Sequence, residues 1–311
     1  MNVTIYQNLL EFWNRSPATI AVETSILLLI GLIAIGGNLL VVISIYRNPS
    51  LRTITNYFVL SLSVTDILYP VLGLTLTIAW SIKSRFAFGH NMCFMQALIS
   101  ISLNLISAAT IVLMAVNRYV CVCKPQYYKK IYNIKTCLIM IGSVWIATFT
   151  LPILLVAKSF WVVEFIPEKI LCGYFYNNKD IVVSVTTNTI LSIALVIPVV
   201  IIIYCYYKVF QKIRQHKKNI APASNPSSLR TSVQEIRVTW TMFAVLVGYC
   251  LAWSPALLFI LATNLTNVNV PRQYHLVVTY TVACGSAINP VIYGLLNTAF
   301  RREFLKILTC K

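Results

Sequence analysis

The sequence is poor in charge, and acidic residues are the scarcest part of it. Only 8 of its 311 residues are Asp or Glu, and the four charged residue types make up 11% of the chain. An ordinary soluble domain has about 25% charged residues. Hydrophobic residues reach 58% and the mean hydropathy is +0.77, which leaves too few polar side chains to cover a soluble globule. The composition therefore excludes a soluble enzyme and a disordered chain.

Features that other functions require are also missing. The 3 His residues are scattered and form no metal-binding pattern such as HExxH. No nucleophile–base pair is visible either, so an enzyme is not expected. A transporter would show repeated halves and several buried charges, and the sequence has neither. The first 20 residues lack the apolar core of a cleavable signal peptide.

Long apolar stretches dominate what is present. A helix needs about 20 mainly apolar residues to cross a bilayer, and seven stretches meet this length: 21–46, 54–82, 90–123, 135–157, 182–210, 234–262 and 273–296. A shorter stretch, 298–309, has an apolar face and a basic face, which is typical of a helix lying on the membrane. We predict an all-α membrane protein, a seven-transmembrane helix bundle with a C-terminal amphipathic helix.

The net charge of +17 predicts the orientation of the bundle. With the N-terminus outside the cell, most Lys and Arg fall on the cytoplasmic side, as the positive-inside rule requires. The glycosylation sequons at Asn2 and Asn264 then lie outside. We expect a multi-pass plasma-membrane protein with an extracellular N-terminus (1–20), a seven-transmembrane domain (21–296), and an amphipathic helix with a short cytoplasmic tail (297–311). The positive charge would face anionic membrane lipid and not nucleic acid.

A few polar residues interrupt the apolar stretches. Asp66 is the only acid deep within one of them, and ionisable groups in such positions are usually functional. One helical face of the third stretch carries Ser100, Asn104, Ser107, Met114 and Arg118. Small polar residues of this kind also connect helices without further function, but a stripe that ends in Arg118 favours a functional role.

Short motifs follow the order of the apolar stretches. They are Gly37-Asn38, Leu62–Asp66, Cys93, Asn117-Arg118-Tyr119, Trp145, Pro198 with Tyr206, Trp253-Ser254-Pro255, Asn289–Tyr293 and Phe300. The set resembles the rhodopsin-like G-protein-coupled receptors along nearly the whole chain. One such motif is weak, but all of them in order, each on its own span, are very specific. The resemblance implies a receptor that activates a heterotrimeric G protein.

Further segments resemble the melatonin receptors. These segments are Gly37–Asp66, Asn117–Tyr119, Tyr128–Tyr132, Tyr293–Asn297 and Phe300–Glu303. They belong to the scaffold and the cytoplasmic side, so they imply coupling to an inhibitory G protein. Leu155, Ala194 and Tyr176 stand where that family carries ligand-contacting Asn, His and Gln residues, which leaves the identity of the ligand open.

The resemblance also implies roles for individual residues. It pairs Cys93 with Cys172 in a disulfide. It assigns a sodium site to Asp66, Ser107 and Asn289, with a protonated Asp66 in a water network as the alternative. The implied ligand pocket is lined by Ser100, Asn104, Tyr174, Trp253 and Thr279. The residues implied in activation and G-protein coupling are Asn117, Arg118, Tyr119, Tyr206, Glu235, Pro255, Pro290 and Tyr293.

Two of these roles have plainer alternatives. Arg118 and Glu235 resemble an ionic latch between the third and sixth spans, but Glu235 also suits a helix start, where the dipole favours an acid. Trp253 is either a switch at the base of the pocket or core packing. Cys310 is a candidate for palmitoylation beside the amphipathic helix.

The pocket residues also restrict the ligand. Ser100 stands where amine receptors carry Asp, so a small neutral ligand is expected. Residues 273–296 contain no Lys, and Ala283 occupies the position of the retinal lysine of opsins. An opsin-related receptor without that lysine is the alternative, and a transporter is a more remote one. No cofactor is expected apart from the sodium ion.

Overall fold

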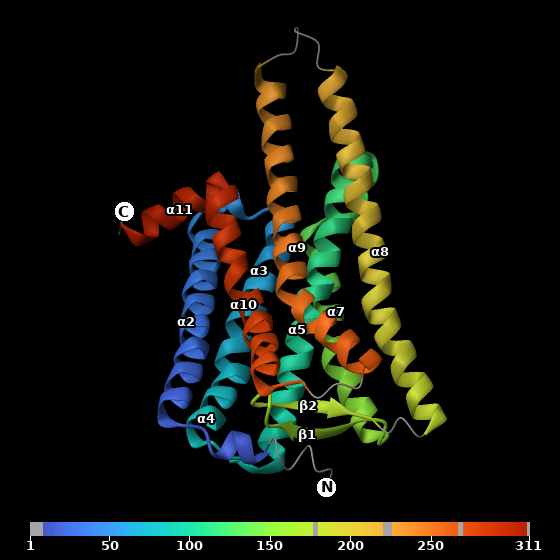
Figure 1. Ribbon diagram of the computed structural model, residues 1–311. Helices are drawn as coiled ribbons and strands as arrows, with labels where there is room; N and C mark the ends of the chain where they lie inside the picture. The colour runs from blue at the N-terminus through green and yellow to red at the C-terminus, as the bar shows by residue number, and fades with distance from the viewer. Residues whose placement is uncertain (1–8, 177–179, 220–225, 267–269, 310–311) are drawn as a thin grey trace.

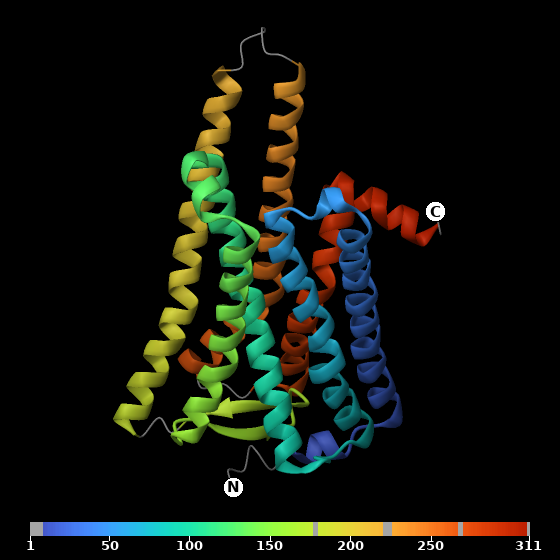
Figure 2. The same cartoon turned by 180° about the vertical axis from the view of Figure 1, so that it is seen from behind.

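The computed structural model describes residues 9–176, 180–219, 226–266 and 270–309, and long helices make up most of them (Figures 1 and 2). The long helices are α2 (Pro17–Arg47), α5 (Gly89–Cys123), α7 (Ile134–Ala157), α8 (Ile181–Asn219), α9 (Pro226–Thr266) and α10 (Arg272–Leu296). Another span is interrupted and consists of α3 (Ile54–Leu68), η2 (Tyr69–Leu74) and α4 (Thr75–Lys83). The described residues contain seven segments long and apolar enough to cross a membrane, which confirms the predicted bundle.

Local sequence explains where several helices begin. The Ser16 hydroxyl accepts a hydrogen bond from the Thr19 N–H at 3.1 Å, and Pro17 occupies the first helical position. Helix α2 therefore starts a few residues earlier than predicted. Side chains cap three other helices in the same way: Thr53 for α3, Asn133 for α7 and Asn297 for α11 (Thr298–Leu308).

The second span widens into a π-helical turn at η2. Pro70 has no N–H to donate to the preceding turn, which favours such a disruption of the regular helix. The widened turn brings Gly73 against α5, where a Cβ added to Gly73 would lie 2.9 Å from the Ser100 hydroxyl oxygen. A larger residue at Gly73 would push the second span away from the predicted ligand pocket.

A β-hairpin covers one end of the bundle (Figure 1). Strands β1 (Val162–Ile166) and β2 (Leu171–Phe175) are antiparallel, with Val162 opposite Phe175 and Ile166 opposite Leu171. The sequence does not predict this hairpin, because two five-residue strands between two spans give little periodic pattern. We call this end of the molecule the hairpin end and the opposite one the α11 end.

Helix α11 is amphipathic, as predicted. Phe300 is fully buried and its ring lies 5.5 Å from that of Tyr293, whereas Arg301 and Arg302 are exposed. Lys306 pairs with Glu303 at 2.8 Å and lowers the pKa of that carboxyl group by donating a hydrogen bond to it. Short η1 (Pro49–Leu51) and α6 (Pro125–Ile131) complete this end.

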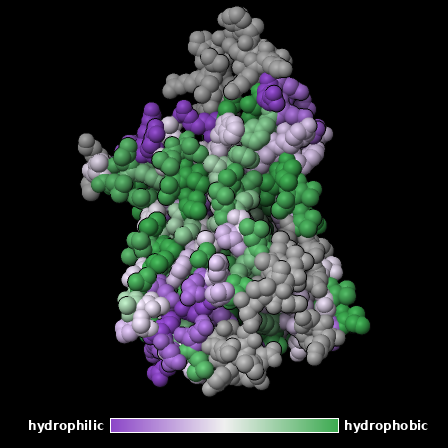
Figure 3. Space-filling view, in the orientation of Figure 1, coloured by the Kyte–Doolittle hydropathy of each residue, from purple (hydrophilic) through white to green (hydrophobic). Residues whose placement is uncertain are grey.

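Apolar side chains line both the inside and the outside of the bundle. Two large buried clusters fill the interior, one around Phe58, Met114 and Tyr293 toward the α11 end, and one around Trp80 and Leu276 toward the hairpin end. On the face shown in Figure 3, hydrophobic residues form a broad band across the middle, and hydrophilic residues gather toward the ends. This distribution is that of a protein with lipid around its middle.

Candidate functional site

The hairpin is attached to the bundle by a disulfide. Cys93, near the start of α5, is bonded to Cys172 of β2, with their Cα atoms 5.4 Å apart, and the predicted pairing is confirmed. The side-chain oxygen of Gln96 accepts a hydrogen bond from the Cys172 N–H at 2.8 Å. The side-chain NH2 group of Gln96 donates to the Thr77 hydroxyl at 3.0 Å. The hairpin is thereby held over the second and third spans.

The predicted pocket residues lie in the hairpin half of the molecule. Ser100 and Asn104 are half-buried neighbours on α5, and the Asn104 amide donates to the Ser100 carbonyl oxygen at 2.8 Å. Thr279 of α10 is buried and donates to the Lys169 carbonyl oxygen, in the turn of the hairpin, at 3.2 Å. The turn between β1 and β2 thus reaches over to α10.

Tyr174 and Lys169 bring polar groups from the hairpin itself. The Tyr174 ring packs 5.0 Å from Trp161, and burial raises the pKa of its hydroxyl to about 12, so it stays a neutral phenol. Burial lowers the pKa of the Lys169 ammonium group, although Glu168 opposes this effect. The Lys169 nitrogen lies 5.7 Å above the Phe259 ring. Lys169 was not among the predicted pocket residues.

Trp253 makes its ring contact within its own helix and not with the other predicted pocket residues. Its ring lies 5.8 Å from that of Tyr249 on the same helix, and no hydrogen bond or ring contact among the described residues connects it to the other four. Leu155 is buried on α7 and Tyr176 is half-buried after β2. The side chain of Ala194 lies outside the described residues.

Asp66 is buried where the second and seventh spans meet. Its carboxylate accepts a hydrogen bond from the Asn289 amide at 2.7 Å. Ser107, the third predicted residue, shares a hydrogen bond of 3.0 Å with the adjacent Thr65 instead. In the described part of the chain, Asp66 forms no ion pair. A buried carboxylate without an ion-pair partner among the described residues fits a small cation, since the cation would supply a counter-charge.

A cavity of about 530 Å³ opens at the α11 end. Three arginines from three different helices line it, namely Arg118, Arg237 and Arg302, together with Thr55, Asn56 and Thr298. Arg237 donates to the Thr298 hydroxyl at 3.0 Å. Three guanidinium groups around one cavity make it attractive to a negatively charged partner.

Two neutral side chains of the described residues bind Arg118 inside this cavity. Arg118 is 4% exposed. Its guanidinium group donates to the side-chain oxygen of Asn117 at 3.2 Å and to the Thr55 hydroxyl. Thr55 also donates to Asn117 at 3.0 Å. Asn117 therefore connects the second and third spans, and it accepts from the arginine as an amide and not as a carboxylate. The side chain of Glu235, the predicted latch partner, lies outside the described residues.

The remaining predicted activation residues lie on α5, α8, α9 and α10. Tyr206 is buried, and its ring centre lies 5.2 Å from that of Phe243. The ring centres of Tyr119 and Tyr204 lie 5.7 Å apart. Pro255 and Pro290 lie inside α9 and α10, where each removes a backbone donor. Asn2 and Cys310 lie outside the described residues, as does the side chain of Asn264.

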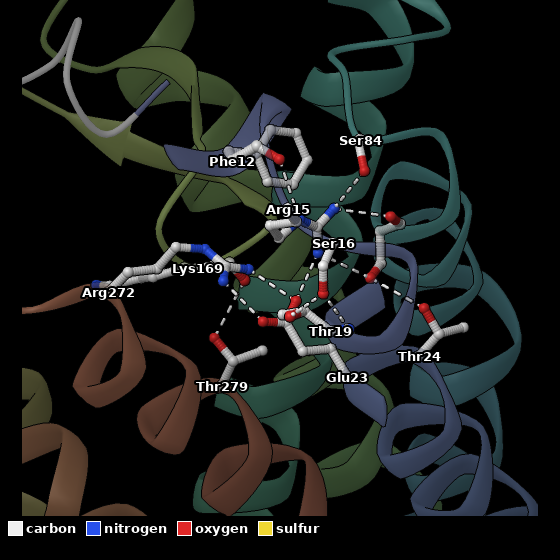
Figure 4. A network of polar contacts seen from close by, with 11 residues as sticks. Phe12, Arg15, Ser16, Thr19, Glu23, Thr24, Ser84, Lys169, Arg272 and Thr279 are labelled. Carbon is white, nitrogen blue, oxygen red and sulfur yellow. Dashed lines mark hydrogen bonds and ion pairs between the residues drawn. The ribbon is translucent and has the colours of Figure 1, made fainter. Parts of the chain in front are cut away.

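One group of buried charges has no counterpart among the site residues predicted from the sequence. Arg15, Glu23 and Arg272 meet at the hairpin end, and Glu23 is paired with both arginines (Figure 4). The orientation predicted from the charges places all three on the outer side, but it predicts no pairing between them. The position of Glu23 within the first turns of the first span was the one available indication that it would be buried.

Comparisons with known proteins agree with this arrangement. The family model "7 transmembrane receptor (rhodopsin family)" matches residues 37–293. The chain is 30% identical over 303 residues to melatonin receptor type 1A of Gallus gallus. The aligned residues cover 94% of this chain and 82% of the relative. It is 29% identical over 293 residues to melatonin receptor type 1A of Ovis aries (93% and 77% covered), and 28% identical over 306 residues to melatonin receptor type 1B-B of Danio rerio (95% and 84%). The chain therefore belongs to the rhodopsin family of seven-transmembrane receptors, as a G-protein-coupled receptor of the melatonin-receptor type and not an enzyme.

Proposed function

We propose that the receptor binds a small neutral ligand at its hairpin end and activates an inhibitory heterotrimeric G protein at its α11 end. The proposal places the hairpin end outside the cell. The N-terminus (1–20) is then extracellular, residues 21–296 form the transmembrane domain, and residues 297–311 lie on the cytoplasmic side. Asn2 and Asn264 would be the glycosylated residues.

The arginine-lined cavity carries this proposal. Arg118, Arg237 and Arg302 offer guanidinium groups, which bind carboxylates through two parallel hydrogen bonds. A helix or chain end from a G protein that carries a carboxylate would bind to them. Arg118 must leave Asn117 and Thr55 to make such a contact, so the network around it would control access to the coupled state.

The chemistry of the hairpin end supports a neutral ligand. The predicted pocket residues supply hydroxyl, amide and aromatic groups, and the phenol of Tyr174 stays protonated at physiological pH. The names of the relatives make melatonin the first candidate. Leu155 and Tyr176 change the polar contacts expected for that ligand, so a related neutral indole is a second candidate.

A G-protein activation screen in cells tests the function. The full chain, with an epitope tag at its N-terminus, is expressed with each class of G protein, and melatonin and related indoles are applied. We expect activation of an inhibitory G protein that Arg118→Ala abolishes at equal surface expression. Activation of another class would overturn the proposed coupling. Coupling that no indole changes would overturn the ligand.

The proposed sodium site has a separate test. Asp66→Asn keeps the shape of the side chain and the contact with Asn289 but removes the charge that a cation needs. We expect sodium chloride, compared with a potassium salt, to reduce basal coupling of the parent receptor, and we expect Asp66→Asn to lose this sensitivity. Sensitivity that persists in Asp66→Asn would favour the protonated carboxyl group instead.

A further inference from the structure

The N-terminal segment 9–16 is packed into the hairpin end of the molecule. Phe12 is fully buried, and its ring lies 5.6 Å from Phe165 of β1, which in turn lies 5.3 Å from Trp80. Phe12 belongs to the same buried cluster as Leu276 of α10. The segment thus forms part of the core that closes this end.

Arg15 fixes this segment through every donor of its guanidinium group. Its Nε donates to the Phe12 carbonyl oxygen at 3.0 Å. One terminal nitrogen donates to Glu23 at 2.5 Å and to the Ser81 hydroxyl at 3.3 Å. The other donates to the Ser81 carbonyl oxygen at 2.7 Å and to the Ser84 hydroxyl at 3.1 Å (Figure 4). A guanidinium group has five N–H donors, so the segment is joined to α2 and to the end of α4.

Glu23 connects this segment to α10. Arg272 donates to both Glu23 carboxylate oxygens, at 2.7 and 2.8 Å, so that one carboxylate serves two guanidinium groups. The side chains are only 3% (Arg15), 9% (Glu23) and 7% (Arg272) exposed. Removing the carboxylate would leave two neighbouring buried cations, whereas removing either arginine would leave one neutral pair. The three residues are called the Glu23 clamp below.

We propose that the Glu23 clamp holds the N-terminal segment and α10 against α2, and thereby keeps the hairpin end of the receptor closed. The clamp rests on the proposed orientation, which places this end outside the cell. Because the three residues come from three parts of the chain, opening the clamp releases the segment and the start of α10 together. The segment is then a gate over the core, and Glu23 is the residue that fastens it.

A cysteine placed beneath the segment reports whether it is closed. Leu276→Cys puts a thiol at a position that is 5% exposed and belongs to the same buried cluster as Phe12. Intact cells are treated with a charged methanethiosulfonate that does not cross membranes, and the rate of labelling is measured. The receptor without Leu276→Cys gives the background. We expect slow labelling in Leu276→Cys and labelling at least about tenfold faster when Glu23→Gln is added.

Three further variants separate the clamp from a general loss of structure. Glu11→Gln removes an exposed carboxylate from the same segment and should leave the rate unchanged. Arg272→Gln leaves the Arg15–Glu23 pair intact, so it should accelerate labelling less than Glu23→Gln does. The double variant Glu23→Gln/Arg272→Gln should label no faster than Glu23→Gln alone, since the two changes remove the same interaction.

The outcomes distinguish the clamp from the proposed function. A rate for Glu23→Gln within about twofold of the parent overturns the clamp, and so does equal acceleration by Glu11→Gln. If Glu23→Gln does not reach the surface, acceleration in Arg272→Gln supports the clamp and an unchanged rate there overturns it. An N-terminal tag that antibodies do not reach on intact cells overturns the orientation. Labelling does not require G-protein coupling. The labelling rates therefore test the clamp even if the activation screen fails.

Discussion

At the scale of single residues, the contacts of Arg118 with two neutral side chains are the most informative feature. A buried arginine beside an aspartate would form an ion pair, but here the neighbour is Asn117 and the second partner is the Thr55 hydroxyl. Hydrogen bonds between a charged and a neutral group are weaker than ion pairs at the same distance. A carboxylate at position 117 would therefore hold Arg118 more firmly than the Asn117 amide does.

We expect Asn117→Asp to lower ligand-independent G-protein activation about fivefold. The carboxylate would strengthen the contact with Arg118 by about 1 kcal/mol, and Arg118 must leave this contact to couple. Thr55→Val removes one partner from the same arginine and should raise basal activation. Both are measured as G-protein activation without ligand, normalised to surface expression. A change in the same direction for the two variants would contradict the role given to this network.

At the scale of helices, the contact between α2 and α10 depends on the absence of a side chain. A Cβ added to Gly37 would lie 2.8 Å from the Pro290 Cβ, too close without movement of one helix. Pro290 interrupts the hydrogen bonding of α10 at this level. The interrupted turn is therefore packed directly against the backbone of the first span, where Asn38 also donates to the Ser286 carbonyl oxygen at 2.9 Å.

Gly37→Ala should destabilise the receptor by about 1–3 kcal/mol, because overpacking forces the two helices apart. Gly36→Ala is a matched control, since nothing lies within 4 Å of the Cβ it would add. On helix propensity alone, that control should be neutral or slightly stabilising. The measurement is the thermal unfolding midpoint of the purified protein in detergent. Equal midpoints for the two variants would show that the close approach of α2 and α10 does not limit stability.

The helices were predictable from the sequence for reasons that do not apply to the contacts between them. The length and hydropathy of a span are local, so all seven were found within a few residues, except where α8 and α9 extend beyond the membrane-length stretches. The face of α5 was also predictable, but not that Ser107 would bond Thr65. The ion pair of Glu23 with Arg272 joins residues 249 positions apart, and no local pattern reports such a pairing.

At the scale of the whole molecule, the hairpin end is held by connections that support one another. The disulfide between Cys93 and Cys172 fixes the hairpin to α5. The Thr279 hydroxyl of α10 donates a hydrogen bond to the turn of the hairpin. The N-terminal segment packs against the hairpin through Phe12 and Phe165. The α11 end, in contrast, is open around a cavity. The molecule thus has one covered end and one end that is open around a cavity.

Breaking the disulfide should therefore loosen the whole covered end and not the hairpin alone. The two cysteines are 79 positions apart, and the chain-entropy estimate for such a loop is about 4–5 kcal/mol, which is an upper value here because the spans stay inserted in the membrane. We expect Cys93→Ser, Cys172→Ser and the double variant to lower surface expression and the unfolding midpoint by the same amount. Reducing agent should lower the midpoint of the parent to that of the variants and leave the variants unchanged. Cys284→Ser, which replaces a free cysteine of α10, should behave like the parent, and a midpoint equal to that of the disulfide variants would contradict this account.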